Sequence, residues 1–250
     1  MTERAEPDLD KADCYSDRER RVMLGYQGYK QRLLAPLLRR LDRLHVTPDG
    51  ITWFSVAPGA AFVPCYLFVP GPWGLFVAHL LLLTHLIVDG IDGPLARHQG
   101  RASSAGSLTD TFGDQLVIVA TALAYATAEG FGRAGLHPVT AGCYAVLYDA
   151  AVMLAMIRNA MGIPYRFLLR PRNFFYGLMW FDAYGWWGAW SPGIVEGTVW
   201  CFNVLLAATV LFGFVAVRRE VARREMAQRE AVRHESQRPE SERAIDREST

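Results

Sequence analysis

The sequence predicts an all-α membrane protein, a polytopic bundle of six transmembrane helices with an N-terminal interfacial amphipathic helix. Two observations lead to this prediction. Half of the residues (51%) are apolar, and they gather in long blocks between residues 51 and 217, while charged residues gather at both ends. Basic residues also alternate between the connecting loops, as they do in chains that cross a membrane repeatedly. The net charge of only +1 gives no bulk attraction for nucleic acid, which is therefore not expected as a partner.

Six apolar blocks are candidates for membrane-spanning helices, because a bilayer core about 30 Å thick requires roughly 20 apolar residues per helix. The third block is polar in its first half, and the fifth is rich in aromatic residues. The blocks cover approximately residues 51–69, 73–91, 106–128, 138–158, 173–190 and 194–217.

The basic residues test this count, since cytoplasmic loops carry an excess of lysine and arginine. The segment before the first block, the second and fourth loops and the segment after the sixth block are basic. The first and fifth loops have no basic residue, and the third has only Arg133. This alternation predicts that both termini are cytoplasmic, and we expect the protein in a bacterial inner membrane.

Apolar residues recur at three- and four-residue steps ahead of the first block, which predicts that residues 18–48 form the amphipathic helix. Such a helix either lies in the bilayer interface against anionic headgroups or packs on the bundle, and the pattern fits both. Residues 1–17 are expected to be disordered, residues 49–217 to form the six-span domain, and residues 218–250 to form a charged cytoplasmic tail.

Four aspartates lie at the cytoplasmic ends of the second and third predicted helices, with spacings that place each pair on one helix face. They are Asp89, Asp92, Asp110 and Asp114. Unpaired carboxylates just inside a membrane repel one another and lose hydration, and divalent cations relieve both costs. The sequence therefore predicts a site for divalent cations such as Mg²⁺ or Mn²⁺, which favours phosphoryl-type transfer. His79 and His85, in the second block, are interpreted as interhelical hydrogen-bonding residues rather than as ligands.

The segment DGIDGPLARHQGRASSAGSLTDTFGD resembles the signature of the CDP-alcohol phosphotransferases, D-x2-D-G-x2-A-R-x8-G-x3-D-x3-D. Every fixed position of the signature matches, with the same spacing. These positions are Asp89, Asp92, Gly93, Ala96, Arg97, Gly106, Asp110 and Asp114.

The resemblance implies roles for these residues. Asp89, Asp92 and Asp110 hold the metals, while Asp114 binds one metal and is the catalytic general base. A CDP-binding site is implied at Gly93, Ala96, Arg97, Ser103, Gly106, Pro48 and Asp49. The acceptor hydroxyl then attacks the phosphorus distal to cytidine, and CMP leaves. The donor is CDP-diacylglycerol or another CDP-alcohol, the acceptor is a small polar alcohol, and the family implies a homodimer.

The sequence does not identify the acceptor. A cluster of arginines between the fourth and fifth blocks suits the phosphate of a polyol phosphate, although it also satisfies the positive-inside rule. These candidates for acceptor binding are Arg158, Arg166, Arg170 and Arg172. The string VDGIDGPLAR resembles bacterial phosphatidylcholine synthases, and aromatic residues of the fifth block, such as Trp180, could cage choline. Transfer from CDP-choline or CDP-ethanolamine to diacylglycerol is a further alternative, and a non-catalytic membrane transporter is the most remote one.

Overall fold

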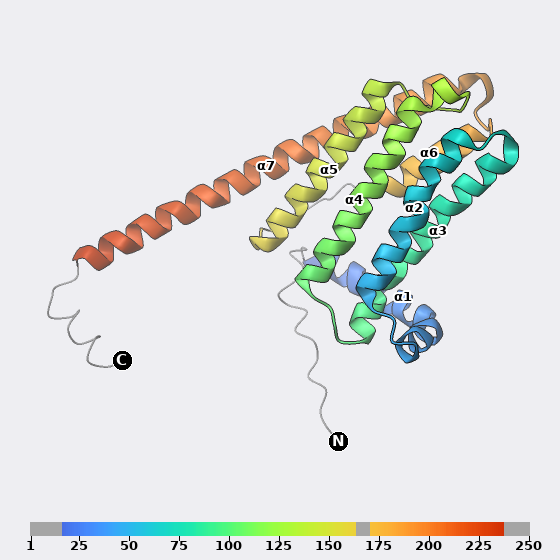
Figure 1. Cartoon of the computed structure of the whole chain (residues 1–250). Helices are drawn as coiled ribbons and strands as arrows, with labels where there is room; N and C mark the ends of the chain where they lie inside the picture. Colours follow the sequence, from blue (N-terminus) through green and yellow to red (C-terminus); the bar gives the residue numbers. More distant parts are fainter. Residues whose placement is uncertain (1–16, 164–170, 238–250) are drawn as a thin grey trace.

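The structure, a computed structural model, describes residues 17–163 and 171–237, and all regular elements in these residues are helices (Figure 1). The α-helices are α1 (Asp17–Arg43), α2 (Pro48–Phe68), α3 (Gly71–His98), α4 (Ser104–Thr127), α5 (Pro138–Ala160), α6 (Arg172–Ala183) and α7 (Ser191–Gln237), and the short 3-10 helices are η2 (Ala128–Phe131) and η3 (Gly188–Trp190). The all-α prediction is thus confirmed for the described residues. The predicted disorder before residue 17 and the tail beyond residue 237 lie outside them.

Two helices begin beside each other with the same kind of cap. Thr47 precedes α2, and its hydroxyl accepts a hydrogen bond of 3.2 Å from the Gly50 N–H. Ser103 precedes α4, and its hydroxyl accepts one of 3.1 Å from the Gly106 N–H. Such caps satisfy N–H groups that have no partner within the helix. Pro48 adds a preset backbone angle at the first position of α2.

The long helices α2, α3, α4 and α5 lie side by side, and α7 packs along α5 before extending beyond the bundle (Figure 1). Large aromatic side chains fill the interior where α2, α4, α5 and α6 meet. The rings of Tyr144 and Phe175, for example, stack with centroids 4.1 Å apart. The fully buried aromatic residues are Phe62, Tyr66, Tyr125, Tyr144 and Phe175.

Within the described residues, four helices are long and apolar enough to cross a membrane: α2, α3, α5 and residues 193–230 of α7. Helix α4, with 24 residues, is long enough, but it contains Asp110 and Asp114 and is not among these four helices. The fifth block, expected over residues 173–190, forms a helix of only 12 residues, α6. At 1.5 Å per residue α6 is about 18 Å long, which is shorter than a bilayer core. Length and composition therefore do not confirm the count of six spans.

Large apolar side chains cover the outside of these helices. Phe68, Trp73 and Phe212 are 65%, 77% and 72% exposed. Contiguous apolar surface of this kind is rare on proteins that are surrounded by water. A hydrocarbon environment explains why these residues point outwards.

Helix α1 lies across one end of the bundle and has two apolar sides. Leu38 is fully buried and packs in a small cluster with Leu95 of α3. On another side, Tyr29 and Leu33 are each 66% exposed. The helix thus packs on the bundle, one of the two alternatives for residues 18–48, and keeps an apolar surface that suits the bilayer interface.

Candidate active site

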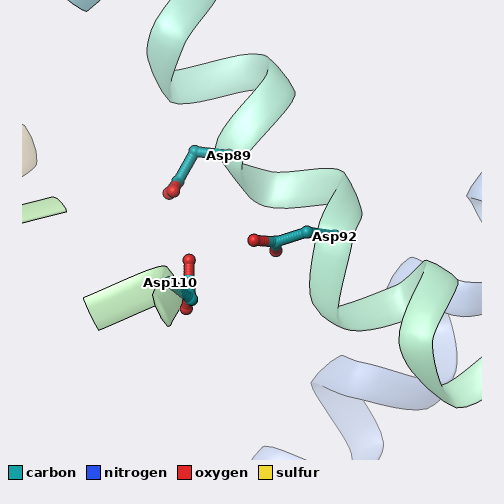
Figure 2. Close-up of side chains that lie close together, drawn as sticks. All are labelled: Asp89, Asp92 and Asp110. Atoms are coloured by element: carbon teal, nitrogen blue, oxygen red, sulfur yellow. The ribbon is translucent and has the colours of Figure 1, made fainter. Parts of the chain in front are cut away.

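Three of the four motif aspartates form one cluster (Figure 2). Asp89 and Asp92 come from α3 and Asp110 from α4, and one oxygen from each carboxylate lies within 4.8 Å of the others. Asp92 is buried, and the other two are half-buried. Oxygen ligands that converge in this way are those that Mg²⁺ and Mn²⁺ prefer, so the residues fit the predicted metals.

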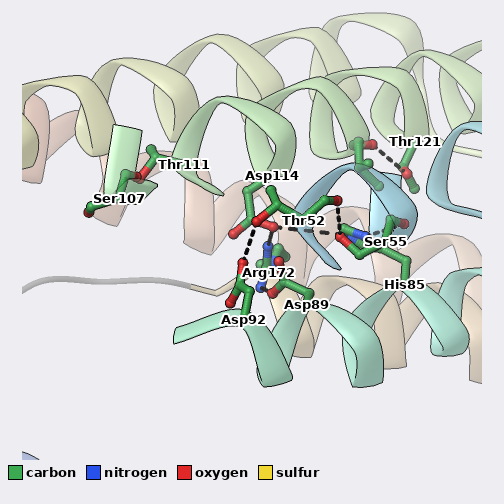
Figure 3. Close-up of polar contacts among 11 residues, drawn as sticks. Thr52, Ser55, His85, Asp89, Asp92, Ser107, Thr111, Asp114, Thr121 and Arg172 are labelled. Atoms are coloured by element: carbon green, nitrogen blue, oxygen red, sulfur yellow. Dashed lines mark hydrogen bonds and ion pairs between the residues drawn. The ribbon is translucent and has the colours of Figure 1, made fainter. Parts of the chain in front are cut away.

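The fourth motif aspartate, Asp114, lies one turn further along α4 and has a different partner. Its carboxylate forms an ion pair with Arg172, the first residue of α6. The same guanidinium donates a hydrogen bond of 3.0 Å to Oδ2 of Asp89 (Figure 3). Arg172 therefore connects Asp114 to the edge of the cluster, and the role of Asp114 as a metal ligand stays a prediction.

Asp92 receives a hydrogen bond on each oxygen. The Thr52 hydroxyl of α2 donates to Oδ2 over 2.7 Å, and the Gly93 N–H donates to Oδ1 over 2.5 Å. Sequence reasoning missed Thr52, because a threonine inside an apolar block is ordinary. Its position one helical turn after Pro48 was the only available signal.

The two histidines of α3 differ. His85 Nδ1 donates to the Ser55 carbonyl of α2 over 3.0 Å, which confirms the interhelical interpretation for this residue. Its Nε2 lies 3.8 Å from Oδ1 of Asp114. His79 Nδ1 instead donates to the Leu75 carbonyl of its own helix. The prediction that His79 forms an interhelical hydrogen bond is therefore wrong for Nδ1.

A cavity of about 380 Å³ opens on one side of the cluster, between the capped ends of α2 and α4 and the end of α3. Its lining includes all the residues that were predicted to bind CDP, namely Pro48, Asp49, Gly93, Ala96, Arg97, Ser103 and Gly106. The lining also includes Thr47, which directly precedes Pro48. The sequence prediction missed four further lining residues, which are Thr52, Arg101, Ala102 and Ser107.

A second cavity, of about 150 Å³, lies on the other side of the cluster between α4, α5 and the start of α6. Asp110 lines both cavities, so a group bound in either one reaches the same carboxylate. The lining of the second cavity is largely polar and comprises Asp110, Thr111, Asp114, Gln115, Tyr148, Val152, Arg172 and Asn173.

The structure describes two of the four arginines that were predicted to bind the acceptor. Arg172 lines the second cavity, whereas Arg158, on the last turn of α5, is not part of its lining. Arg166 and Arg170 lie outside the described residues.

Trp180, which was considered for binding choline, lies elsewhere. Trp180 packs against His79, with ring centroids 5.2 Å apart. Trp180 is eight residues after Arg172 on α6, or roughly 12 Å along the helix axis. The structure therefore does not place this aromatic residue beside the carboxylates.

Comparison with protein families matches residues 45–179, more than half of the chain, to the family described as CDP-alcohol phosphatidyltransferase. The chain belongs to the CDP-alcohol phosphatidyltransferase family. The matched residues include the motif, both cavities and Arg172, while all of α1 and all of α7 lie outside them. Family membership and the apolar helices together identify an integral membrane protein.

Two curated relatives are similar to the central part of the chain. Phosphatidylinositol phosphate synthase of Cutibacterium acnes is 33% identical over 124 residues, which cover 48% of this chain and 56% of that protein. Archaetidylinositol phosphate synthase of Aeropyrum pernix is 29% identical over 138 residues, which cover 55% of this chain and 59% of that protein. The similarity thus spans less than two thirds of the length of either relative.

A solved structure supports the fold of this family. The apo form of Mycobacterium tuberculosis phosphatidylinositol phosphate synthase aligns with a TM-score of 0.55 and 18% identity, covering 73% of this chain and 94% of that chain. At this level of identity the likeness concerns the fold alone.

Proposed function

We propose that this protein transfers a phosphatidyl group from CDP-diacylglycerol to the hydroxyl of a small polar alcohol and releases CMP, as a step of phospholipid biosynthesis. The position of the carboxylate cluster between two cavities that share Asp110 carries the proposal. Such an arrangement suits two substrates that react across one site. Membership of the family supports an enzyme over the non-catalytic transporter.

Asp89, Asp92 and Asp110 are the proposed ligands of Mg²⁺ or Mn²⁺, with Asp114 completing a two-metal site. The fit rests on the three carboxylate oxygens within 4.8 Å of one another and on their partial burial, which leaves like charges close together. When bound, the cations would supply positive charge that neutralises the donor diphosphate and the departing CMP.

The larger cavity is the proposed site of the CDP moiety. Helices α2 and α4 begin beside this cavity, and helix N-termini favour anions. Arg97 and Arg101 add two cationic side chains to the lining. A Cβ atom at Gly106 would lie 3.3 Å from the Ser103 hydroxyl and 3.7 Å from an Asp49 carboxylate oxygen, so glycine keeps this part of the cavity open.

Asp114 is the proposed general base, since its carboxylate lines the smaller cavity. It takes the proton of the acceptor hydroxyl, and the oxygen attacks the phosphorus distal to cytidine. A new P–O bond forms to the acceptor, and the P–O bond to CMP breaks with the electron pair leaving on CMP. Arg172 orients the Asp114 carboxylate through their ion pair.

A polyol phosphate, such as inositol phosphate or glycerol phosphate, is the proposed acceptor. Arg172 offers a guanidinium for its phosphate, and Thr111, Gln115 and Tyr148 offer polar groups for its hydroxyls. The names of both curated relatives indicate inositol phosphate products. A choline acceptor would need an aromatic cage, and Trp180 is packed against His79 instead. Diacylglycerol as acceptor would favour an apolar cavity.

Acceptor choice is tested by lipid-product mass spectrometry with CDP-diacylglycerol and a panel of acceptors. We expect lipid from inositol phosphate or glycerol phosphate and none from choline.

Arg172→Ala should raise the acceptor KM about 10- to 100-fold, because a hydrogen bond to a charged group contributes about 1.5–3 kcal/mol. Trp180→Ala should leave this KM near the wild-type value. Labelled choline appearing in lipid, with none from the polyol phosphates, would exclude this acceptor class.

We further propose that both termini are cytoplasmic, as is the active site. Arg133 donates a hydrogen bond of 3.3 Å to the Gly71 carbonyl at the start of α3, and Asp89 lies 18 residues later on that helix. This separation is about 27 Å, close to a bilayer core. Reporter fusions at Thr250 and in the loop around Arg133 should therefore report opposite sides, and the same side for both would refute the orientation. The homodimer and the bacterial inner membrane remain predictions.

A further inference from the structure

A hydroxyl of helix α2 is bonded to one of the proposed metal ligands. Thr52 and Asp92 are 3% and 7% exposed, and the Thr52 Oγ1 lies 2.7 Å from Oδ2 of Asp92 (Figure 3). The other acceptor near this hydroxyl is the Pro48 carbonyl, at 3.4 Å. A hydroxyl has a single proton, and the shorter contact indicates that it points to the carboxylate.

The Thr52 bond completes a pair that fixes the plane of the Asp92 carboxylate. The Gly93 N–H occupies one side of Oδ1, and the Thr52 hydroxyl occupies one side of Oδ2. Because an ionised carboxylate has about four lone-pair positions, each oxygen keeps one free for a cation. Asp92 is thus presented to Asp89 and Asp110 in one orientation.

Thr52 is itself held between the two helices that carry the aspartates. On α4, Gly113 lies so close that an added Cβ would be 2.8 Å from Val56 Cγ2 and 3.5 Å from Thr52 Cγ2. The absence of a side chain at Gly113 therefore lets α4 pack directly on this part of α2. Threonine is also stiff about χ1, so its hydroxyl has few alternative positions.

We propose that Thr52 is a positioning residue that raises the metal affinity of the site by orienting Asp92. The inference rests on the proposed function, whose metal ligands include Asp92. Groups that orient metal ligands typically change metal affinity 10- to 100-fold when they are removed, so we expect about this effect from loss of the hydroxyl.

The test is a titration of the purified full-length protein with Mn²⁺ alone, followed by electron paramagnetic resonance, with no nucleotide or acceptor present. Thr52→Val keeps the shape but lacks the hydroxyl, and its Kd for Mn²⁺ should rise about 10- to 100-fold. Thr52→Ser restores the donor and should bind Mn²⁺ like the wild type.

Thr121→Val is a matched control, because Thr121 of α4 is also fully buried and donates to the Val117 carbonyl of its own helix over 2.7 Å. This variant should bind Mn²⁺ like the wild type. If Thr52→Val does not fold, Thr52→Ala takes its place, with the same expected loss of affinity.

The outcomes separate this inference from the proposed function. Wild-type affinity for Mn²⁺ in Thr52→Val would overturn the inference but would not contradict the proposed metal site. Weaker binding of CDP with unchanged Mn²⁺ affinity would make Thr52 a nucleotide contact, which also overturns it. If the wild-type protein binds no Mn²⁺, the result excludes both the proposed metal site and the inference about Thr52.

Discussion

Asp114→Asn is expected to lower turnover by about 10² or more, since a general base contributes roughly that factor. Asparagine has nearly the same shape as aspartate but cannot accept the proton of the acceptor hydroxyl. Asp114 does not line the larger cavity, so CDP affinity should change little. Turnover measured with CDP-diacylglycerol and the identified acceptor, together with calorimetric titration of CDP, checks both expectations.

A buried carboxylate away from the proposed site provides the control. Asp182 is 8% exposed, lies near the end of α6 that is distant from Arg172, and accepts a hydrogen bond from the Ser191 hydroxyl. Asparagine can still accept this bond through its carbonyl oxygen, so Asp182→Asn should retain turnover. If Asp114→Asn kept more than about a tenth of the wild-type rate, Asp114 would not be an essential base.

Removal of divalent cations is expected to abolish activity completely. The oxygens of Asp89, Asp92 and Asp110 lie within 4.8 Å of one another, and without cations these carboxylates repel each other and cannot stabilise a diphosphate. Activity after chelation should return when Mg²⁺ or Mn²⁺ is added. Full activity after exhaustive chelation would exclude the metal-dependent mechanism.

The same cations should stabilise the folded protein. Binding to the folded state alone contributes about 2.7 kcal/mol when the free cation is at 100 times its Kd. The melting temperature of the wild-type protein should therefore rise on addition of Mg²⁺ or Mn²⁺. Asp110→Asn should lose most of this rise, whereas Asp182→Asn should retain it. An equal rise in all three proteins would place the bound cation outside the aspartate cluster.

The sequence alone was sufficient to predict the helical fold and most of the residues around the larger cavity. Within one helix, spacing determines which side chains share a face, so Asp89 with Asp92, and Asp110 with Asp114, could be assigned to common faces. The motif resemblance then selected residues such as Arg97 and Ser103, and the structure brings them around one cavity.

Residue spacing within one helix did not predict how that helix contacts its neighbours. The aromatic run of the fifth block predicted a full span, but the helix ends at Ala183, followed by turns and η3. The arginine cluster predicted several acceptor contacts, and among its described members Arg172 alone lines the smaller cavity. The run of apolar residues in α2 also concealed the Thr52 hydroxyl.

What the sequence determined by itself is which residues each helix offers on each face, because helical periodicity is a local property of the chain. Only the tertiary structure decided that Thr52 meets Asp92, that Arg172 meets Asp114 and that Trp180 meets His79. These pairings depend on how far each helix is rotated and shifted against its neighbours. That placement comes from close packing at positions such as Gly113, where the absence of a side chain determines how near two helices approach.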